Sequence, residues 1–400
     1  MIGIAIGRSF GLNVAAAIAG IGATLFITWY FGLAEFAYFT INSAKLSLIL
    51  LGAELLPSSF TIFRLQEDPR FTSSVPVFYV AFAGFATIVA AVLISSGLVS
   101  HWSWFMLLFV FNSALQRYFD TQAQASGRVD AYFWIPATTN ITRLGLLASL
   151  SQLHFLAVED VLWASSAVGG IIGQAVMVSR FPEFFDRSIY RQPFAKIVYL
   201  WSLRRAYYEY YANSVLKRFR DTFLPLFCDL AIPSKAEIGR LLVFTRANEA
   251  VCGQVRILEA FMVNRAIREN LRRARRLIFW TIAPLGHAAV ATVALILMYR
   301  HGIKLEDVTL ALLTGFFIYP YILELFWRND ALASFRPRRV TVSLVTFLLT
   351  LTLPPTLAWA TGTLSIPILV GSYILAQIFA ALTYRLFKLR RFAGQESRTA

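Results

Sequence analysis

Residues 75–99, VPVFYVAFAGFATIVAAVLISSGLV, decide the fold, because this stretch contains no charged side chain. At about 1.5 Å per residue, a helix of this length is long enough to cross a hydrocarbon core of roughly 30 Å. Similar stretches recur along the chain, in which 58% of residues are hydrophobic and only 15% are charged. Soluble domains have about 25% charged residues. We therefore interpret the chain as an integral membrane protein.

Outward from that stretch, apolar segments of spanning length fall into two groups separated by a long basic interruption. We predict an all-α, polytopic protein with about 12 transmembrane helices. The segments are 9–31, 33–56, 75–99, 102–124, 131–152 and 161–178, and then 220–232, 238–263, 278–299, 308–326, 340–359 and 366–386. The first is too long for the apolar region of a cleaved signal peptide. Segment 220–232 is too short unless its helix begins earlier, so ten spans with a cytoplasmic insert stay an alternative.

The basic residues predict the orientation of these spans. The chain has 37 Lys and Arg against 22 Asp and Glu. Loops on one predicted side hold most of the basic residues, whereas loops on the other side hold only Lys235, Arg300 and Lys304. By the positive-inside rule both termini are cytoplasmic. We expect the membrane to be a cell inner (plasma) membrane. Basic residues so placed contact anionic membrane lipids, so we expect no nucleic-acid partner.

A short internal repeat supports a division into halves. The sequence LAEFA at 33–37 recurs loosely as KAEIG at 235–239, half the chain later and again at the start of an even-numbered span. Parallel repeats of this kind occur in transporter folds. We predict two six-helix lobes related by a parallel repeat, at 1–180 and 217–388, followed by a cytoplasmic tail at 389–400. The basic, aromatic linker at 181–216 is typical of a helix lying in the headgroup layer.

Several short motifs carry a resemblance to a known family. FGLAEFAY at 31–38, followed by Gly52 and Arg64, resembles the opening of the polysaccharide (O-antigen type) flippases of the multidrug/oligosaccharidyl-lipid/polysaccharide exporter superfamily. The turn at 233–239 and the loop ASGR at 125–128 resemble later parts of that family. Ala37 stands where the family usually has Gly, and Arg240 stands where an aromatic residue is usual.

The resemblance implies a two-lobed bundle that alternates between inward-open and outward-open states. Its cargo would be an undecaprenyl-pyrophosphate-linked oligosaccharide, moved from the cytoplasmic to the outer leaflet for bacterial surface polysaccharide, either lipopolysaccharide or exopolysaccharide. Machinery for polysaccharide synthesis is then a candidate partner, docked on the linker. A cation-coupled drug exporter of the same superfamily and a polytopic glycosyltransferase or polymerase are the alternatives.

A charged side chain inside a predicted span costs free energy, so we expect each one to have a structural or functional role. Lys45 lies about 15 Å beyond Glu35, and Arg246 lies about 13.5 Å beyond Glu237, both counted from the outer ends of their spans. Arg143 is also deep, about 20 Å from the cytoplasmic end of its span. We predict that these three cations line a central cavity and neutralise the pyrophosphate of the cargo. The other predicted substrate-binding residues are Asn140, Glu249 and Arg240.

Structural alternatives stay open for most of these residues. Arg246 could pair with Glu249, and Lys45 could reach Glu249 or a backbone carbonyl. Arg240, near the outer surface, could snorkel or guard the exit. Asp229 could bind a coupling ion or form a salt bridge to Lys235.

Catalytic and cofactor signatures are missing from the sequence. It contains no GxxxxGK[ST] phosphate loop, no GxSxG and no HExxH. The only cysteines, Cys228 and Cys252, lie in apolar surroundings and cannot build a thiolate metal site. The external loops are too short to hold a sugar for polymerisation. We predict no enzyme activity, no metal and no cofactor.

Overall fold

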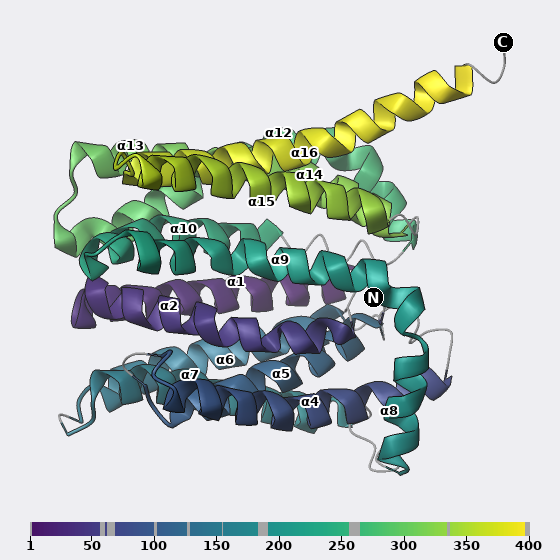
Figure 1. The fold of residues 1–400 in the computed structure, drawn as a ribbon, viewed down its shortest axis with the longest axis horizontal. Helices are drawn as coiled ribbons and strands as arrows, with labels where there is room; N and C mark the ends of the chain where they lie inside the picture. Colours follow the sequence, from purple (N-terminus) through teal and green to yellow (C-terminus); the bar gives the residue numbers. More distant parts are fainter. Residues whose placement is uncertain are drawn as a thin grey trace. The chain divides into compact units, whose positions relative to one another are not determined.

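The structure is a computed structural model that describes residues 2–56, 61, 69–99, 102–125, 129–153, 155–182, 191–255, 265–333 and 337–396. These residues form helices joined by short turns, and no β-strand occurs among them (Figure 1). The all-α prediction is confirmed. Long apolar helices satisfy their own backbone groups, which is what a hydrocarbon environment demands.

Every predicted span of the first half coincides with a helix. The helices are α1 (Ile2–Phe26) with the π-helical turn η1 (Ile27–Phe31), α2 (Leu33–Ile49) with the 3₁₀ turn η2 (Leu50–Leu55), α4 (Pro69–Ser95), α5 (Phe105–Ala125), α6 (Val129–Leu150) and α7 (Val158–Arg180). Gly32 separates η1 from α2 and has a φ of 100°, a conformation that favours glycine.

The spans of the second half are helical as well. They are α9 (Arg204–Ala231), α10 (Lys235–Val255), α12 (Arg265–Met298) with η5 (Tyr299–His301), α13 (Leu305–Gly315), α14 (Ile318–Ala333), α15 (Pro337–Ala360) and α16 (Ile366–Glu396). The doubtful seventh span is explained by α9, whose 28 residues begin well before Arg220. At about 42 Å, this helix is long enough to cross.

The tenth predicted span is divided into α13 and α14 by a turn at Phe316 and Phe317. Pro320 explains this break. A proline has no N–H to donate to the carbonyl of Phe316, four residues earlier, and its ring clashes with that carbonyl. The backbone N–H of Tyr319 donates to the Phe316 carbonyl oxygen instead, at 3.3 Å.

Seven helical stretches in the described part of the chain are long and apolar enough to cross a membrane, judged by length and composition alone. They run from Gly7–Phe31 in the first half to Ile366–Leu386 in the second. The other predicted spans, α2, α5, α6, α9 and α10, are helices with more polar side chains. Lys45, Arg143, Asp229, Arg240 and Arg246 lie on these helices.

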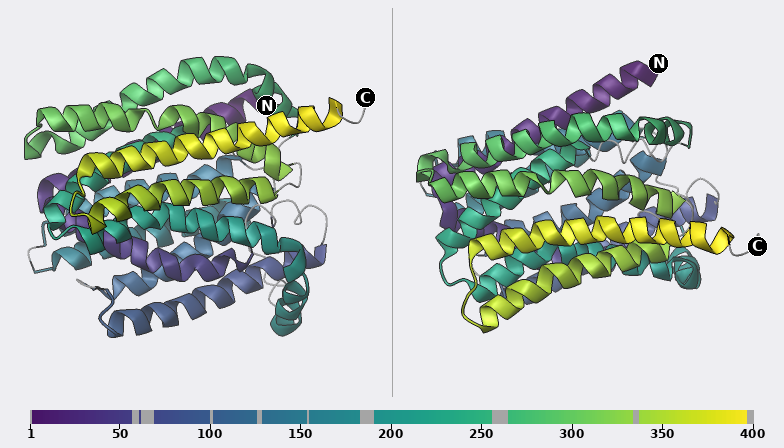
Figure 2. Two further views of the ribbon diagram at one scale, coloured as in Figure 1. Left: turned by 45° about the horizontal axis from the view of Figure 1, so that its top comes forward. Right: turned by 90° about the horizontal axis from the view of Figure 1, so that it is seen from above.

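The chain divides into two compact units, Met1–Arg218 with Thr222–Gly239 and Phe219–Asp221 with Arg240–Ala400. In the first unit α6 packs against both α1 and α7, and α4 packs against α5. In the second unit α15 and α16 lie side by side in both views of Figure 2. The predicted lobe and linker boundaries were defined by membrane spans, whereas these two units are defined by contacts between residues. The predicted boundaries therefore stay predictions.

A short helix, α8 (Pro193–Ser202), occupies the predicted linker. It lies crosswise to the long helices of the first unit and packs against α4 (Figure 1). Leu200 is buried, while Phe194, Val198 and Trp201 are 79%, 52% and 58% exposed. An exposed apolar face on a crosswise helix agrees with a position in the headgroup layer, which stays a prediction.

The two copies of the internal repeat touch each other within the first unit. A Cβ atom on Gly239, the fifth residue of α10, would overlap the backbone carbonyl oxygen of Leu33, the first residue of α2. A backbone atom cannot move aside as a side chain can. Ala37, which occupies the corresponding place in the first copy, is completely buried.

We expect Gly239→Ala to lower the free energy of unfolding by roughly 1–3 kcal/mol, because it overpacks this contact. Gly253→Ala on the same helix is the control, since an added Cβ there meets nothing within 4 Å. Helix propensity alone makes that control neutral or stabilising by up to about 1 kcal/mol. Thermal melting of the detergent-solubilised protein measures both. Equal melting temperatures for the two variants would refute the close approach.

Candidate functional site

A cluster of three charged residues lies in the first unit, formed by Lys45 on α2, Asp229 on α9 and Lys235 at the start of α10. The Lys45 Nζ is 2.9 Å from Asp229 Oδ2, and the Lys235 Nζ donates to Asp229 Oδ1 at 2.5 Å. The Lys235 ammonium also lies 5.8 Å from the centre of the Tyr38 ring. We call these three residues the Lys45 cluster.

Two cations in the Lys45 cluster share one carboxylate, so the cluster carries one net positive charge. All three side chains remain partly accessible, with exposed fractions of 29% for Lys45 and 24% for Asp229 and Lys235. The Asp229–Lys235 salt bridge that the sequence left open is confirmed. The structure gives Lys45 the carboxylate of Asp229 as its partner, which the sequence did not suggest.

Arg143 and Asn140 lie on α6, in the same unit. The Arg143 guanidinium carbon is 4.9 Å from the centre of the Phe39 ring on α2, a cation–π arrangement. The Asn140 side-chain amide donates to the Ala16 carbonyl oxygen at 2.8 Å and thereby joins α6 to α1. That hydrogen bond gives Asn140 a structural role; its predicted cargo contact stays a prediction.

Arg240 in the second unit forms a bidentate ion pair with Asp307, at the start of α13. Its Nε donates to Oδ1 at 2.7 Å and its Nη2 to Oδ2 at 2.5 Å. The Asp307 side chain is completely buried, and its Oδ2 also accepts the Lys304 backbone N–H at 2.9 Å. The guanidinium is thus held by a buried carboxylate. Its predicted roles at the exit and in cargo binding stay predictions.

Arg246 and Glu249 form the pair that the sequence left open. The Arg246 Nη1 donates to Glu249 Oε2 at 2.7 Å, one helical turn away on α10. Their side chains are 36% and 50% exposed. Arg246 thus lies in the second unit, while Lys45 and Arg143 lie in the first. The cavity roles of all three cations stay predictions.

A buried ionic cluster in the second unit was not anticipated. Glu324 Oε1 lies 3.4 Å from the Arg328 Nη1 and 3.7 Å from the Arg220 Nη1, while Gln377 donates to Glu324 Oε2. Arg220 also contacts Asp221 at 3.1 Å. The Arg220, Glu324 and Arg328 side chains are only 10%, 2% and 7% exposed. The sequence could have indicated the Glu324–Arg328 pair, because the two residues are four apart on one helix.

Metal coordination has no support in the part of the chain that the structure describes. No three His, Cys, Asp or Glu side chains gather there in a way that could hold a metal ion. Cys228 and Cys252 are both buried, and each is a free thiol. With two ammonium groups around one carboxylate, the Lys45 cluster can attract an anion, and its carboxylate can exchange partners.

Comparison with solved structures identifies the fold. A multidrug resistance MATE family transporter of the MOP superfamily, in its outward-facing conformation, matches with a TM-score of 0.70 and 13% identity, over 98% of this chain and 96% of that one. The Vibrio cholerae MATE transporter VcmN matches with a TM-score of 0.65 and 11% identity, over 98% of both chains. A eukaryotic MATE transporter matches with a TM-score of 0.63 and 14% identity, over 96% and 94%.

No protein-family model matches the sequence, and no curated protein matches it either. At such low identities the structural likeness establishes the fold. The chain has the fold of MATE transporters, and the predicted polytopic all-α architecture with about 12 transmembrane helices is confirmed. The solved structures that it resembles are transporters and not enzymes.

Proposed function

We propose that this protein moves an undecaprenyl-pyrophosphate-linked oligosaccharide from the cytoplasmic to the outer leaflet by alternating access. The MATE-like fold supports a transport function, and the flippase motifs at 31–38 and 233–239 support this cargo. The protein would act in the bacterial inner membrane with both termini in the cytoplasm, as the distribution of Lys and Arg predicts.

The observation that carries the proposal is the net positive charge of the Lys45 cluster. Lys45 lies about 15 Å along α2 from Glu35, halfway through the predicted span. Its ammonium is partly accessible and shares Asp229 with Lys235. A charged pyrophosphate is costly to place in the hydrocarbon core of a membrane. A cluster with net positive charge halfway through the predicted span would lower that cost and therefore favours such a cargo. Phosphate oxygens would compete with Asp229 for Lys45 and leave Asp229 paired with Lys235.

A cation-coupled drug exporter is the second candidate. Its support is the accessible carboxylates, since Asp229 and Glu249 are 24% and 50% exposed and could take up a proton or cation. The solved structures with this fold include multidrug resistance transporters. In this function Asp229 would exchange its lysine partners for the coupling ion.

Transport by the purified protein in liposomes separates the two candidates. A labelled lipid-linked oligosaccharide is placed in the inner leaflet, and its arrival outside is measured with an impermeant enzyme that removes the sugar. We expect the protein to expose the oligosaccharide faster than empty liposomes do. In cells, loss of the gene should make lipid-linked oligosaccharide accumulate on the cytoplasmic leaflet. Gradient-driven movement of a cationic dye without oligosaccharide exposure would instead establish the exporter.

A further inference from the structure

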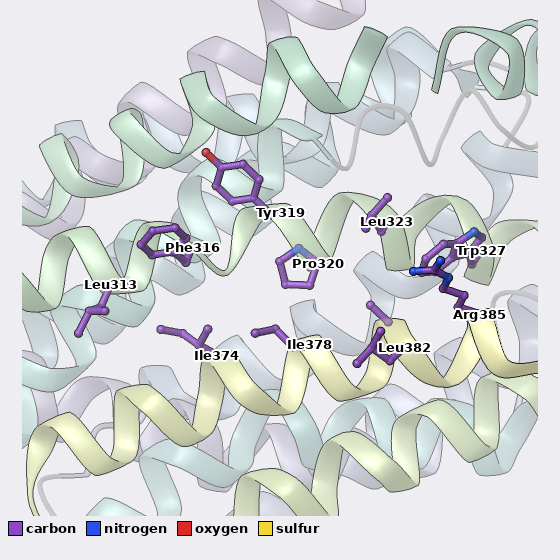
Figure 3. Close-up of a pocket in the computed structure, with 11 residues that line it drawn as sticks. Leu313, Phe316, Tyr319, Pro320, Leu323, Trp327, Ile374, Ile378, Leu382 and Arg385 are labelled. Carbon is purple, nitrogen blue, oxygen red and sulfur yellow. The ribbon is translucent and has the colours of Figure 1, made fainter. Parts of the chain in front are cut away.

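A groove on the surface of the second unit is lined almost entirely by apolar side chains. Its volume is about 510 Å³, within the roughly 300–1,000 Å³ of small-molecule sites. One wall comes from α14 and the turn that precedes it, and the other wall comes from α16 (Figure 3). The lining residues include Phe316, Leu323 and Trp327 on the first wall and Ile374, Ile378 and Arg385 on the second.

The groove follows from the break in the tenth span. The turn at Phe316 and Phe317 interrupts the helix, and Pro320, which explains this turn, itself lines the groove. As a result, α13 and α14 do not present one continuous ridge to α16. Phe316 and Ile378 remain 52% and 36% exposed. The walls therefore face the surroundings of the protein, which we predict to be lipid because α14 and α16 belong to predicted spans.

The length of the groove matches one leaflet. Ile374 and Arg385 are eleven residues apart on α16, which corresponds to about 16.5 Å. That distance is about half of the roughly 30 Å hydrocarbon core. An acyl chain from one leaflet would fit this length, whereas an undecaprenyl chain is far longer.

One end of the groove is chemically distinct. Arg385 lies there, and Figure 3 shows its side chain beside Trp327. No ion pair joins Arg385 to a carboxylate within the described residues. In the sequence, Lys388, Arg390 and Arg391 follow closely. Arginine and tryptophan together mark the level of lipid headgroups.

We propose that this groove binds one anionic glycerophospholipid of the cytoplasmic leaflet. An acyl chain lies between α14 and α16, and the phosphate lies at Arg385, which can contact it with two N–H groups. The charge distribution along the sequence places the Arg385 end on the cytoplasmic side. This site does not depend on which cargo the protein carries.

Native mass spectrometry of the delipidated protein tests the site. Phosphatidylglycerol and phosphatidylcholine with identical chains are added in turn, together with undecaprenyl phosphate as a competitor. We expect one phosphatidylglycerol to be retained in preference to phosphatidylcholine. Arg385→Gln should reduce that preference about fivefold, since one basic residue at the headgroup level is worth about that factor. Arg276→Gln is the matched control, because Arg276 is also exposed near the same predicted membrane surface.

A second pair of variants tests the groove itself without a change of charge. Ile378→Trp should fill the groove and abolish preferential retention, whereas Leu375→Trp should not, because Leu375 is exposed on α16 but does not line the groove. Equal retention of both phospholipids, or unchanged retention by Arg385→Gln, overturns the proposal. Displacement of phosphatidylglycerol by equimolar undecaprenyl phosphate also overturns it and assigns the groove to an undecaprenyl chain.

Discussion

Replacing Lys45 with glutamine is expected to slow translocation of a lipid-linked oligosaccharide at least about tenfold while the protein still folds. A hydrogen bond to a charged group contributes about 1.5–3 kcal/mol, which corresponds to a factor of roughly 10–100. Folding should persist because Asp229 keeps Lys235 as its partner. The liposome assay measures the rate, and thermal melting in detergent measures the folding.

Three further variants show which property of Lys45 matters. Lys45→Arg keeps the charge and should retain most transport. Lys235→Gln removes the other partner of Asp229 at the outer end of the span and should have the smaller effect. Asp229→Asn leaves both cations without a competing carboxylate and should preserve cargo binding. If Lys45→Gln and Lys235→Gln slow transport equally, the salt bridge and not the deep cation is what transport requires.

Most of the helices could be predicted from the sequence because their apolar segments are long enough to cross a bilayer. Segment 220–232 is the exception, since α9 begins among charged residues well before it. Local ion pairs could be predicted as well. Arg246 and Glu249 are three residues apart on one helix, and Asp229 and Lys235 flank one short turn, so their spacing alone suggested contact. Both pairs are present.

Ion pairs between distant segments could not be predicted in this way. Lys45 and Asp229 lie on α2 and α9, and Arg220 and Glu324 lie on α9 and α14. Helical periodicity gives the face of each residue but not which helix packs against that face. The internal repeat indicated that 33–37 and 235–239 correspond, yet it could not show that Gly239 contacts Leu33.

Arg240 illustrates how tertiary pairing changes the expected behaviour of a single residue. A snorkelling arginine could be removed at little cost, since its charge lies in water. Here the partner is the completely buried carboxylate of Asp307. Arg240→Met leaves that charge buried without its partner, and we expect the free energy of unfolding to fall by about 3–5 kcal/mol. Denaturation of the detergent-solubilised protein measures this loss.

Arg246→Met is the matched control for this prediction, because it makes the same substitution on the same helix. Its partner Glu249 is 50% exposed, and an exposed pair contributes about 0–1 kcal/mol. Adding Asp307→Asn to Arg240→Met should restore most of the lost stability, since the asparagine is neutral and its side-chain oxygen can still accept the Lys304 N–H. Equal losses for the two arginine variants, or no recovery in the double variant, would show that Arg240 contributes through its surroundings and not through the buried carboxylate.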